Sequence, residues 1–289
     1  MKLRALVSAI ALSVLSPLAS ADIVASDDFN YAQGELPNTQ APGSGWAGAW
    51  TAATAITQVV DPDVDLGSGN ALSIIGTSNT SGASTGNNSA AVQRTLSPTF
   101  SGNELFVSFL FQLDSGALTN NDFLGLWFND NSTTARSDLT NRPNIGIKAN
   151  GGSGTNDIFV RTTGTEGSFA LDSDIGSSTR VTYQIVGRLW RTAESGNYSN
   201  FDLWLNPIFA DLTKPDAKSS GNAGISTVTR VGFRTANLDG GDTLLIDNLI
   251  LAENWNDVVA APNAVPEPGS LALAGLALLG LGLARRRRS

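Results

Sequence analysis

The chain has 289 residues, contains no cysteine and no histidine, and carries a formal net charge of −8. Without those two residue types it cannot form a disulfide, a Cys–His or Ser–His–Asp nucleophilic centre, or a metal site with histidine or thiolate ligands. Carboxylate chemistry, metals bound through oxygen, and binding by aromatic and amide side chains remain.

The first 21 residues have the layout of a secretory signal peptide. Lys2 and Arg4 form a basic start, an apolar stretch covers 5–15, and small residues at 19–21 offer a cleavage site. We expect export through the Sec translocon, cleavage by signal peptidase and a mature chain that starts at Asp22. A buried amphipathic helix is the alternative for the same stretch.

The body of the chain, residues 22–264, is acidic. Six of the 18 basic residues of the chain lie outside the body, namely Lys2, Arg4 and the four terminal arginines, and so does one of the 26 acidic residues, Glu267. The body therefore has 12 basic and 25 acidic residues and a net charge of −13. Nucleic acid and anionic lipid both require clustered cations. Neither is therefore expected as a partner of the body.

Apolar residues alternate with period two along much of the body, whereas no long stretch has helical periodicity. The clearest strands are 104–113 and 180–190; further candidates are 23–31, 71–75, 91–96, 122–129, 144–148, 157–163, 201–206, 226–234 and 243–251. Glycine-rich segments at 150–154 and 239–242 are expected to close hairpins. The pattern predicts one all-β domain over 22–259, an antiparallel β-sandwich; its jelly-roll-like character is implied only by the family resemblance described below.

Six tryptophans are the main aromatic side chains of the body. Trp46 and Trp50 lie in a glycine- and alanine-rich loop segment, so we interpret them as candidates for stacking on sugar rings. Trp127 and Trp204 lie in strands flanked by apolar residues, and we expect them in the core.

Residues 260–264 are linker-like, and the tail that follows, 265–289, has three parts. Pro266, Glu267 and Pro268 come first, an apolar segment covers 271–284, and Arg285, Arg286, Arg287 and Arg288 end it. As a helix the apolar segment rises about 21 Å, which is short of a hydrocarbon layer of about 30 Å. The arginines favour the cytoplasmic side, while the signal peptide carries the body outward. A helix packed in the protein's own core is the alternative.

These three parts, in this order and in a chain with a signal peptide, resemble the PEP-CTERM sorting tail of Gram-negative bacteria. The resemblance covers residues 265–289. It implies recognition by an exosortase, an intramembrane cysteine transpeptidase that cuts near Pro266, Glu267 and Pro268 and passes the protein to the cell surface or the extracellular polysaccharide matrix. The short apolar helix would hold the protein in the inner membrane only transiently.

Four stretches of the body, 26–31, 45–50, 202–207 and 246–250, resemble concanavalin A-like and laminin-G-like jelly rolls. In such folds the first and last strands are commonly neighbours, which would bring Asp28 near Asp247. With Asn248 these residues would offer the oxygen ligands that calcium prefers. Capping of turns and strand ends is the alternative role for all three.

We therefore expect an exported cell-surface or extracellular-matrix protein that binds carbohydrate or serves as a structural module of the matrix. The alternative is a carbohydrate-active enzyme, a glycoside hydrolase or lyase, on the same fold. Glycoside hydrolysis requires two carboxylates about 5–9 Å apart, and none of the five glutamates of the body stands in a Glu-x-Asp-x-x-Glu arrangement. No catalytic residue is assigned.

Overall fold

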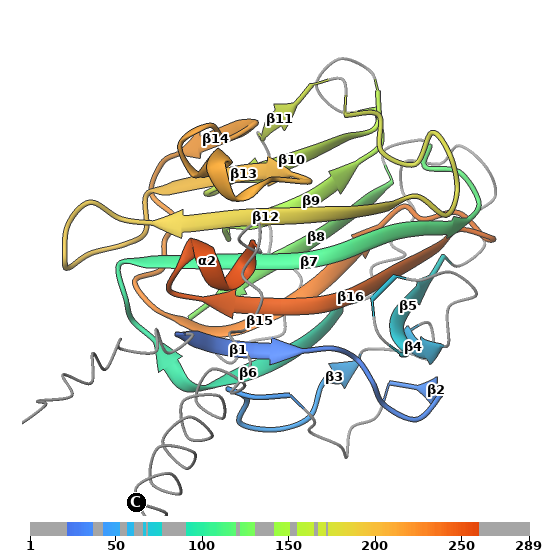
Figure 1. Cartoon of the computed structure of the whole chain (residues 1–289), viewed down its shortest axis with the longest axis horizontal. Coiled ribbons are helices and arrows are strands. Elements are labelled where there is room, and N and C mark those ends of the chain that lie inside the picture. The colour runs from blue at the N-terminus through green and yellow to red at the C-terminus, as the bar shows by residue number, and fades with distance from the viewer. Residues whose placement is uncertain are drawn as a thin grey trace, which may run out of the picture.

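The computed structural model describes residues 22–36, 43–52, 57–60, 66–67, 69–76, 91–119, 122–130, 142–150, 155–164, 167–171 and 173–259. Over these residues the chain forms two antiparallel sheets packed as a sandwich, with one 3-10 helix and one short α-helix (Figure 1). The all-β sandwich expected from the alternation is confirmed. Neither described helix is long and apolar enough to cross a membrane. The expected signal peptide (1–21), linker and tail (260–289) lie outside the described residues.

The larger sheet has nine strands. In spatial order these are β14 (Ala217–Ser220), β13 (Asn200–Leu205), β12 (Thr182–Trp190), β7 (Glu104–Ser115), β16 (Thr243–Ala252), β5 (Ala71–Ile75), β4 (Thr57–Val60) and β2 (Gly34–Glu35), and β1 (Ile23–Asp27) also pairs with β16. The register of β1 and β16 sets Asp27 opposite Leu249. The expected pairing of the first and last strands is thereby confirmed.

The smaller sheet has seven strands. Their order is β11 (Ser168–Ala170), β10 (Asp157–Arg161), β9 (Asn144–Lys148), β8 (Phe123–Asn129), β15 (Val228–Ala236), β6 (Ala91–Phe100) and β3 (Thr51–Ala52). Segment 150–154 joins β9 to β10, which are antiparallel neighbours as expected. The hairpin expected at 239–242 is wrong, because β15 lies in this sheet and β16 in the other. A glycine-rich turn fixes local geometry but not the sheet that the next strand joins.

The hydrophobic core lies between the two sheets. Alternation puts every second side chain of a strand inside, for example Leu124, Leu126 and Phe128 of β8 against Phe109 and Phe201 of the larger sheet. In a chain without disulfides, this burial and the ladder hydrogen bonds supply the stability.

A separate apolar cluster closes the outer face of the larger sheet. Helix α2 (Trp255–Val258) lies in front of this sheet in Figure 1, and the 3-10 helix η1 (Phe209–Thr213) packs beside it. The rings of Trp204 and Trp255 lie 4.9 Å apart. Their indole nitrogens donate to the backbone oxygens of Asp211 and Phe209, at 2.8 and 2.9 Å. The part of this face under α2 and η1 is therefore covered, and its two indole donors are paired.

The segment around residues 43–47 joins the two sheets at one edge. Ser44 forms a backbone bridge with Ser26 of β1, and Trp46 forms one with Leu96 of β6. Gly43 and Gly45 have positive φ angles of 89° and 81°. A β-carbon on Gly45 would lie 1.9 Å from the backbone oxygen of Val24. Glycine is required where this segment passes so close to β1.

Candidate binding face and candidate metal centre

A row of side chains crosses the outer face of the seven-stranded sheet. Strand register sets Gln93, Gly232, Trp127, Asn144 and Arg161 opposite one another on five successive strands. Because their neighbours along each strand point into the core, these residues face away from it. We call the following side chains, which share this side of the sheet, the polar face: Gln93, Trp127, Asn129, Asn144, Arg161, Arg230 and Arg234.

Five buried polar atoms of the polar face have no hydrogen-bond partner among the residues that the structure describes. They are Gln93 Oε1, Trp127 Nε1, Asn129 Nδ2, Asn144 Oδ1 and Arg230 Nε. Trp127 is only 2% exposed and Asn129 is fully buried, so bulk water does not solvate them. An unpaired buried polar atom costs about 1–3 kcal/mol, and native proteins contain few of them. Five on one side of one sheet indicate a surface made to hold ordered water or a polar ligand.

The same side of the sheet also concentrates positive charge. Four of the 12 basic residues of the body lie there, namely Lys148, Arg161, Arg230 and Arg234. The guanidinium carbon of Arg161 lies 4.3 Å from the ring centroid of Phe159, and that of Arg234 lies 5.5 Å from that of Phe123. Such stacking orients the planar guanidinium groups. In a body with a net charge of −13, this face is suited to a hydroxyl-rich or carboxylate-bearing ligand.

The structure places Trp46 and Trp50 together, but not as a platform for sugars. Trp50 is 1% exposed, its ring packs on Phe29 and Phe233, and its Nε1 donates to Asp27. Ligand stacking on Trp50 is therefore wrong, because both faces of the indole lie inside the protein. Trp46 is half-buried and donates from Nε1 to the backbone oxygen of Ser26 at 2.8 Å; stacking on it stays a prediction.

Trp127 and Trp204 are both buried, as expected, but neither lies between the sheets. Trp204 belongs to the cluster under α2, and Trp127 lies on the polar face. Strand β8 carries apolar residues on both of its faces, so alternation alone does not reveal which face is inside.

Asp28 and Asn248, two of the three residues expected to bind calcium, line one cleft of about 450 Å³ beside β1. Asp247 is 1% exposed, and its Oδ1 accepts a hydrogen bond from the backbone N–H of Asn248 at 2.7 Å. Its Oδ2 lies against Gly67, where a β-carbon would come within 2.0 Å. The structure therefore brings Asp28 and Asn248 to one cleft, and calcium binding there stays a prediction.

A cleft of about 480 Å³ lies at the β14 edge of the larger sheet, lined among others by Trp190, Asp202 and Lys218. Trp190 donates from Nε1 to Asp202 Oδ2 at 2.9 Å, and the guanidinium carbon of Arg188 lies 4.8 Å from the Trp190 ring. Burial raises the pKa of Asp202. Here the indole donor and the carboxylate satisfy each other, unlike the polar groups of the polar face.

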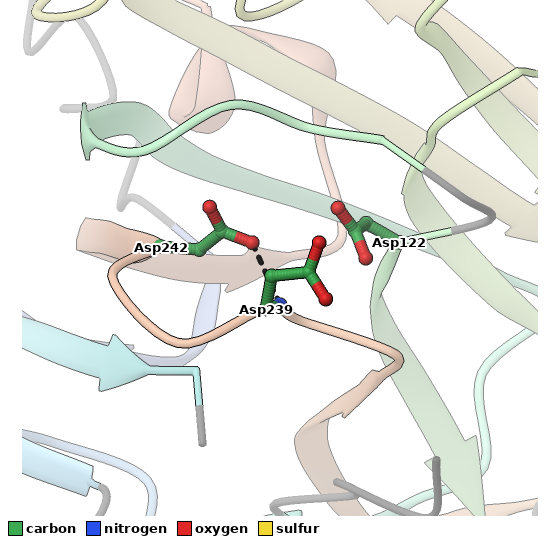
Figure 2. Close-up of side chains that lie close together, drawn as sticks. All are labelled: Asp122, Asp239 and Asp242. Carbon is green, nitrogen blue, oxygen red and sulfur yellow. Dashed lines mark hydrogen bonds between the residues drawn. The ribbon is translucent and has the colours of Figure 1, made fainter. Parts of the chain in front are cut away.

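Three carboxylates meet at the end of the sandwich where β15 leads into β16 (Figure 2). Asp122 directly precedes β8, Asp242 directly precedes β16, and Asp239 lies in the turn between β15 and β16. One oxygen from each lies within 4.8 Å of the others. We call these three residues the aspartate cluster. Such hard oxygen ligands are the kind that calcium or magnesium accepts.

Burial and mutual repulsion shape the aspartate cluster. Burial, and then the charges of Asp242 and Asp239, raise the pKa of Asp122 to about 7. Burial also raises the pKa of Asp242, whose side chain accepts hydrogen bonds from the backbone N–H groups of Ala117 and Asp239 at 3.0 and 2.8 Å. None of the ion pairs between described residues involves the cluster. In the sequence, 239–242 resembles a turn and 122 the start of a strand, and nothing marks them as ligands, because only the pairing of distant strands brings them together.

A buried network around Asp27 was not expected from the sequence. Asp27 Oδ2 accepts hydrogen bonds from Tyr31 and Trp50, each at 2.6 Å, and forms an ion pair with Arg94. Burial raises the pKa of Asp27 against the opposing effect of these donors and of Arg94. Alternation along β6 could have indicated this network, because it places Arg94 on the inner face of the strand beside apolar residues.

Comparison with protein families decides the nature of the tail, since residues 264–288 match the model of the PEP-CTERM protein-sorting motif. The chain carries a PEP-CTERM sorting motif. The motif indicates an exported protein that is sorted by an exosortase and anchored transiently in the membrane before cleavage. No curated protein matches the sequence.

Solved structures similar to this chain have sandwich folds. The carbohydrate recognition domain of Emp47p is 12% identical, with a TM-score of 0.50 over 81% of this chain and 96% of that one. The alginate lyase Aly36B is 14% identical, with a TM-score of 0.48 over 80% and 98%. The globular domain of T. cruzi calreticulin is 10% identical, with a TM-score of 0.47 over 82% and 90%. At these identities the similarity concerns the fold alone.

Proposed function

We propose that this exported protein binds an extracellular polysaccharide through the polar face of its seven-stranded sheet. In this proposal residues 1–21 are the signal peptide, 22–259 the binding domain, 260–264 a linker and 265–289 the sorting tail. Signal peptidase and the Sec translocon act at the N-terminus, and an exosortase acts at Pro266, Glu267 and Pro268. The final location is the cell surface or the extracellular matrix.

The observation that carries the proposal is the set of five buried polar atoms without partners. Three of these atoms are donors: the indole N–H of Trp127, the amide NH₂ of Asn129 and the Nε–H of Arg230. The other two, the amide oxygens of Gln93 and Asn144, are acceptors. A sugar hydroxyl both donates and accepts, so a polysaccharide that displaces the groups covering these buried atoms can pair with them.

The arginines indicate which sugars fit best. Guanidinium groups pair with carboxylates in a planar, two-bonded geometry. Arg161, Arg230 and Arg234 share the polar face, which makes a polymer of uronic acids a better ligand than a neutral glucan. The carbohydrate recognition domain of Emp47p has a similar fold, so a sugar ligand is compatible with this fold; the likeness does not separate binding from cleavage.

The test is affinity electrophoresis of the exported protein in gels that contain a uronic-acid polysaccharide or a neutral glucan. We expect the uronic-acid gel to retard the wild-type protein more strongly, and an Arg230→Gln variant to lose that preference. Release of unsaturated or reducing ends from either polymer would instead support the alternative, a carbohydrate-active enzyme. Equal mobility in all gels would contradict the proposal.

The cleft at the β14 edge is the competing location for a ligand. A Trp190→Ala variant separates the two sites because Trp190 lines that cleft and lies in the other sheet. Retardation that persists in Trp190→Ala and falls in Arg230→Gln supports the polar face. The opposite result would move the site to the cleft.

A further inference from the structure

We propose that the aspartate cluster, Asp122, Asp239 and Asp242, binds one calcium ion that links the two sheets of the sandwich. This site is separate from the polar face and does not depend on polysaccharide binding. It also differs from the site at Asp28, Asp247 and Asn248 expected from the sequence.

The distances within the aspartate cluster fit one ion. Calcium binds oxygens at about 2.3–2.6 Å, so two ligands of one ion are at most about 4.6–5.2 Å apart, twice the bond length. One oxygen from each of the three residues lies within 4.8 Å of the others. Figure 2 shows the carboxylates of Asp122 and Asp239 facing each other, with that of Asp242 on the far side of Asp239.

An unpaired atom supplies an independent indication of a ligand. Asp122 is 1% exposed, and its Oδ1 is buried without a hydrogen-bond partner. Its Oδ2 accepts a hydrogen bond from the backbone N–H of Thr119 at 2.6 Å, which fixes the carboxylate in place. A buried carboxylate oxygen with no donor is unfavourable while it is charged, and a cation in contact with it offsets that cost as a proton would.

The surrounding backbone holds the other carboxylates in a fixed position. The two oxygens of Asp242 accept hydrogen bonds from the backbone of Ala117 and Asp239. Gly116 leaves room for this arrangement, because a β-carbon there would lie 2.1 Å from Asp242 Oδ1. Thr119 Oγ1 lies 3.3 Å from Asp239 Oδ2. The three side chains are therefore preorganised by two connecting loops rather than left free at the surface.

The ligand chemistry selects the metal. All three groups are carboxylates, and the chain contains no histidine or cysteine, which disfavours zinc and copper. Calcium accepts irregular sets of carboxylates, carbonyls and waters, whereas magnesium demands a near-ideal octahedron. Calcium sites of extracellular modules typically have dissociation constants of about 10⁻⁴–10⁻³ M, which suits an exported protein.

The ion would stabilise the fold. Asp122 directly precedes a strand of the seven-stranded sheet, and Asp242 directly precedes a strand of the nine-stranded sheet. An ion shared by both would hold the ends of the two sheets together. At a calcium concentration about 100 times the dissociation constant, the midpoint of thermal unfolding should rise by roughly 5–10 °C.

The experiment is thermal unfolding of the exported protein after removal of metal, followed by titration with calcium or magnesium chloride. We expect a saturable rise with calcium and a smaller rise with magnesium. An Asp122→Asn variant should lose most of the calcium-dependent rise, while its metal-free midpoint stays equal to or above that of the wild type because a buried charge has been removed.

Asp28→Asn is the matched control, since it removes a carboxylate from the other acidic site. This variant should keep the calcium-dependent rise. An unchanged wild-type midpoint in calcium would overturn the proposal, as would a full rise in Asp122→Asn or a rise lost only in Asp28→Asn. Polysaccharide binding serves as a separate readout: its loss in Arg230→Gln, with the calcium response intact, would show that the two sites are distinct.

Discussion

Asp27 and Arg94 form an ion pair in which neither side chain is exposed to solvent. Asp27 ends β1 in the nine-stranded sheet and Arg94 lies in β6 of the seven-stranded sheet, so the pair joins the two layers. Tyr31 and Trp50 donate to the same carboxylate, and Arg94 Nε donates to the backbone oxygen of Gly48 at 2.7 Å. These contacts hold β1 and the 43–50 segment against one edge of the core.

Replacing Asp27 by asparagine should destabilise the protein by about 3–5 kcal/mol, because Arg94 would remain buried without its counter-charge. Asp28→Asn changes an exposed neighbour and should alter stability by less than about 0.5 kcal/mol. The free energy of unfolding in urea measures both. A double variant, Asp27→Leu with Arg94→Met, should be less destabilised than the sum of its parts; additive losses would show that the two charges are not coupled.

Gly45→Ala should cost about 2 kcal/mol or more, since φ is positive and the added carbon meets the Val24 oxygen. Gly48→Ala is the matched control three residues later, where nothing lies within 4 Å of the added carbon. That variant should be neutral or more stable by up to about 1 kcal/mol. Equal unfolding midpoints for the two variants would argue against the close passage of this segment over β1.

Trp127→Phe and Trp204→Phe form a second matched pair. Both remove an indole from a buried site, but only Trp204 has a paired N–H, bonded to Asp211. Trp204→Phe should therefore be less stable than Trp127→Phe by about 1 kcal/mol or more. A larger loss in Trp127→Phe would indicate that its N–H has a protein partner after all.

Exported protein purified from the native host should lack residues 271–289, because the PEP-CTERM motif marks the tail for removal. Alanine at 266–268 should prevent this cleavage and leave the protein in the membrane fraction. Mass spectrometry of the secreted and membrane fractions makes the comparison. An intact C-terminus on secreted wild-type protein would argue against processing at this motif.

Much of the fold could be predicted from the sequence, because alternation marks the long strands well. The observed bounds of β5 and β9 agree with the expected 71–75 and 144–148, and β7, β12 and β16 differ by a few residues at their ends. Short strands such as β2, β3 and β11 were missed, since two or three residues carry no measurable period.

The candidate sites were harder to predict, because they depend on which strands become neighbours. Trp127 and Asn144 are 17 positions apart and lie opposite each other only through the pairing of β8 and β9. Asp122 and Asp242 meet because β8 pairs with β15, whose end leads through Asp239 to the start of β16. Trp50 was expected at a binding surface, but a buried acceptor, Asp27, draws its indole N–H into the interior.

If the polar face binds a polysaccharide through its unpaired donors and acceptors, Trp127→Phe should weaken that binding, because it removes one of these donors. Affinity electrophoresis of the exported protein in uronic-acid polysaccharide should show about tenfold weaker binding for Trp127→Phe than for wild type, which corresponds to one lost hydrogen bond of about 1.4 kcal/mol. Trp204→Phe, measured in the same gel, should bind as the wild type does. Wild-type affinity in Trp127→Phe, or an equal loss in both variants, would contradict the account.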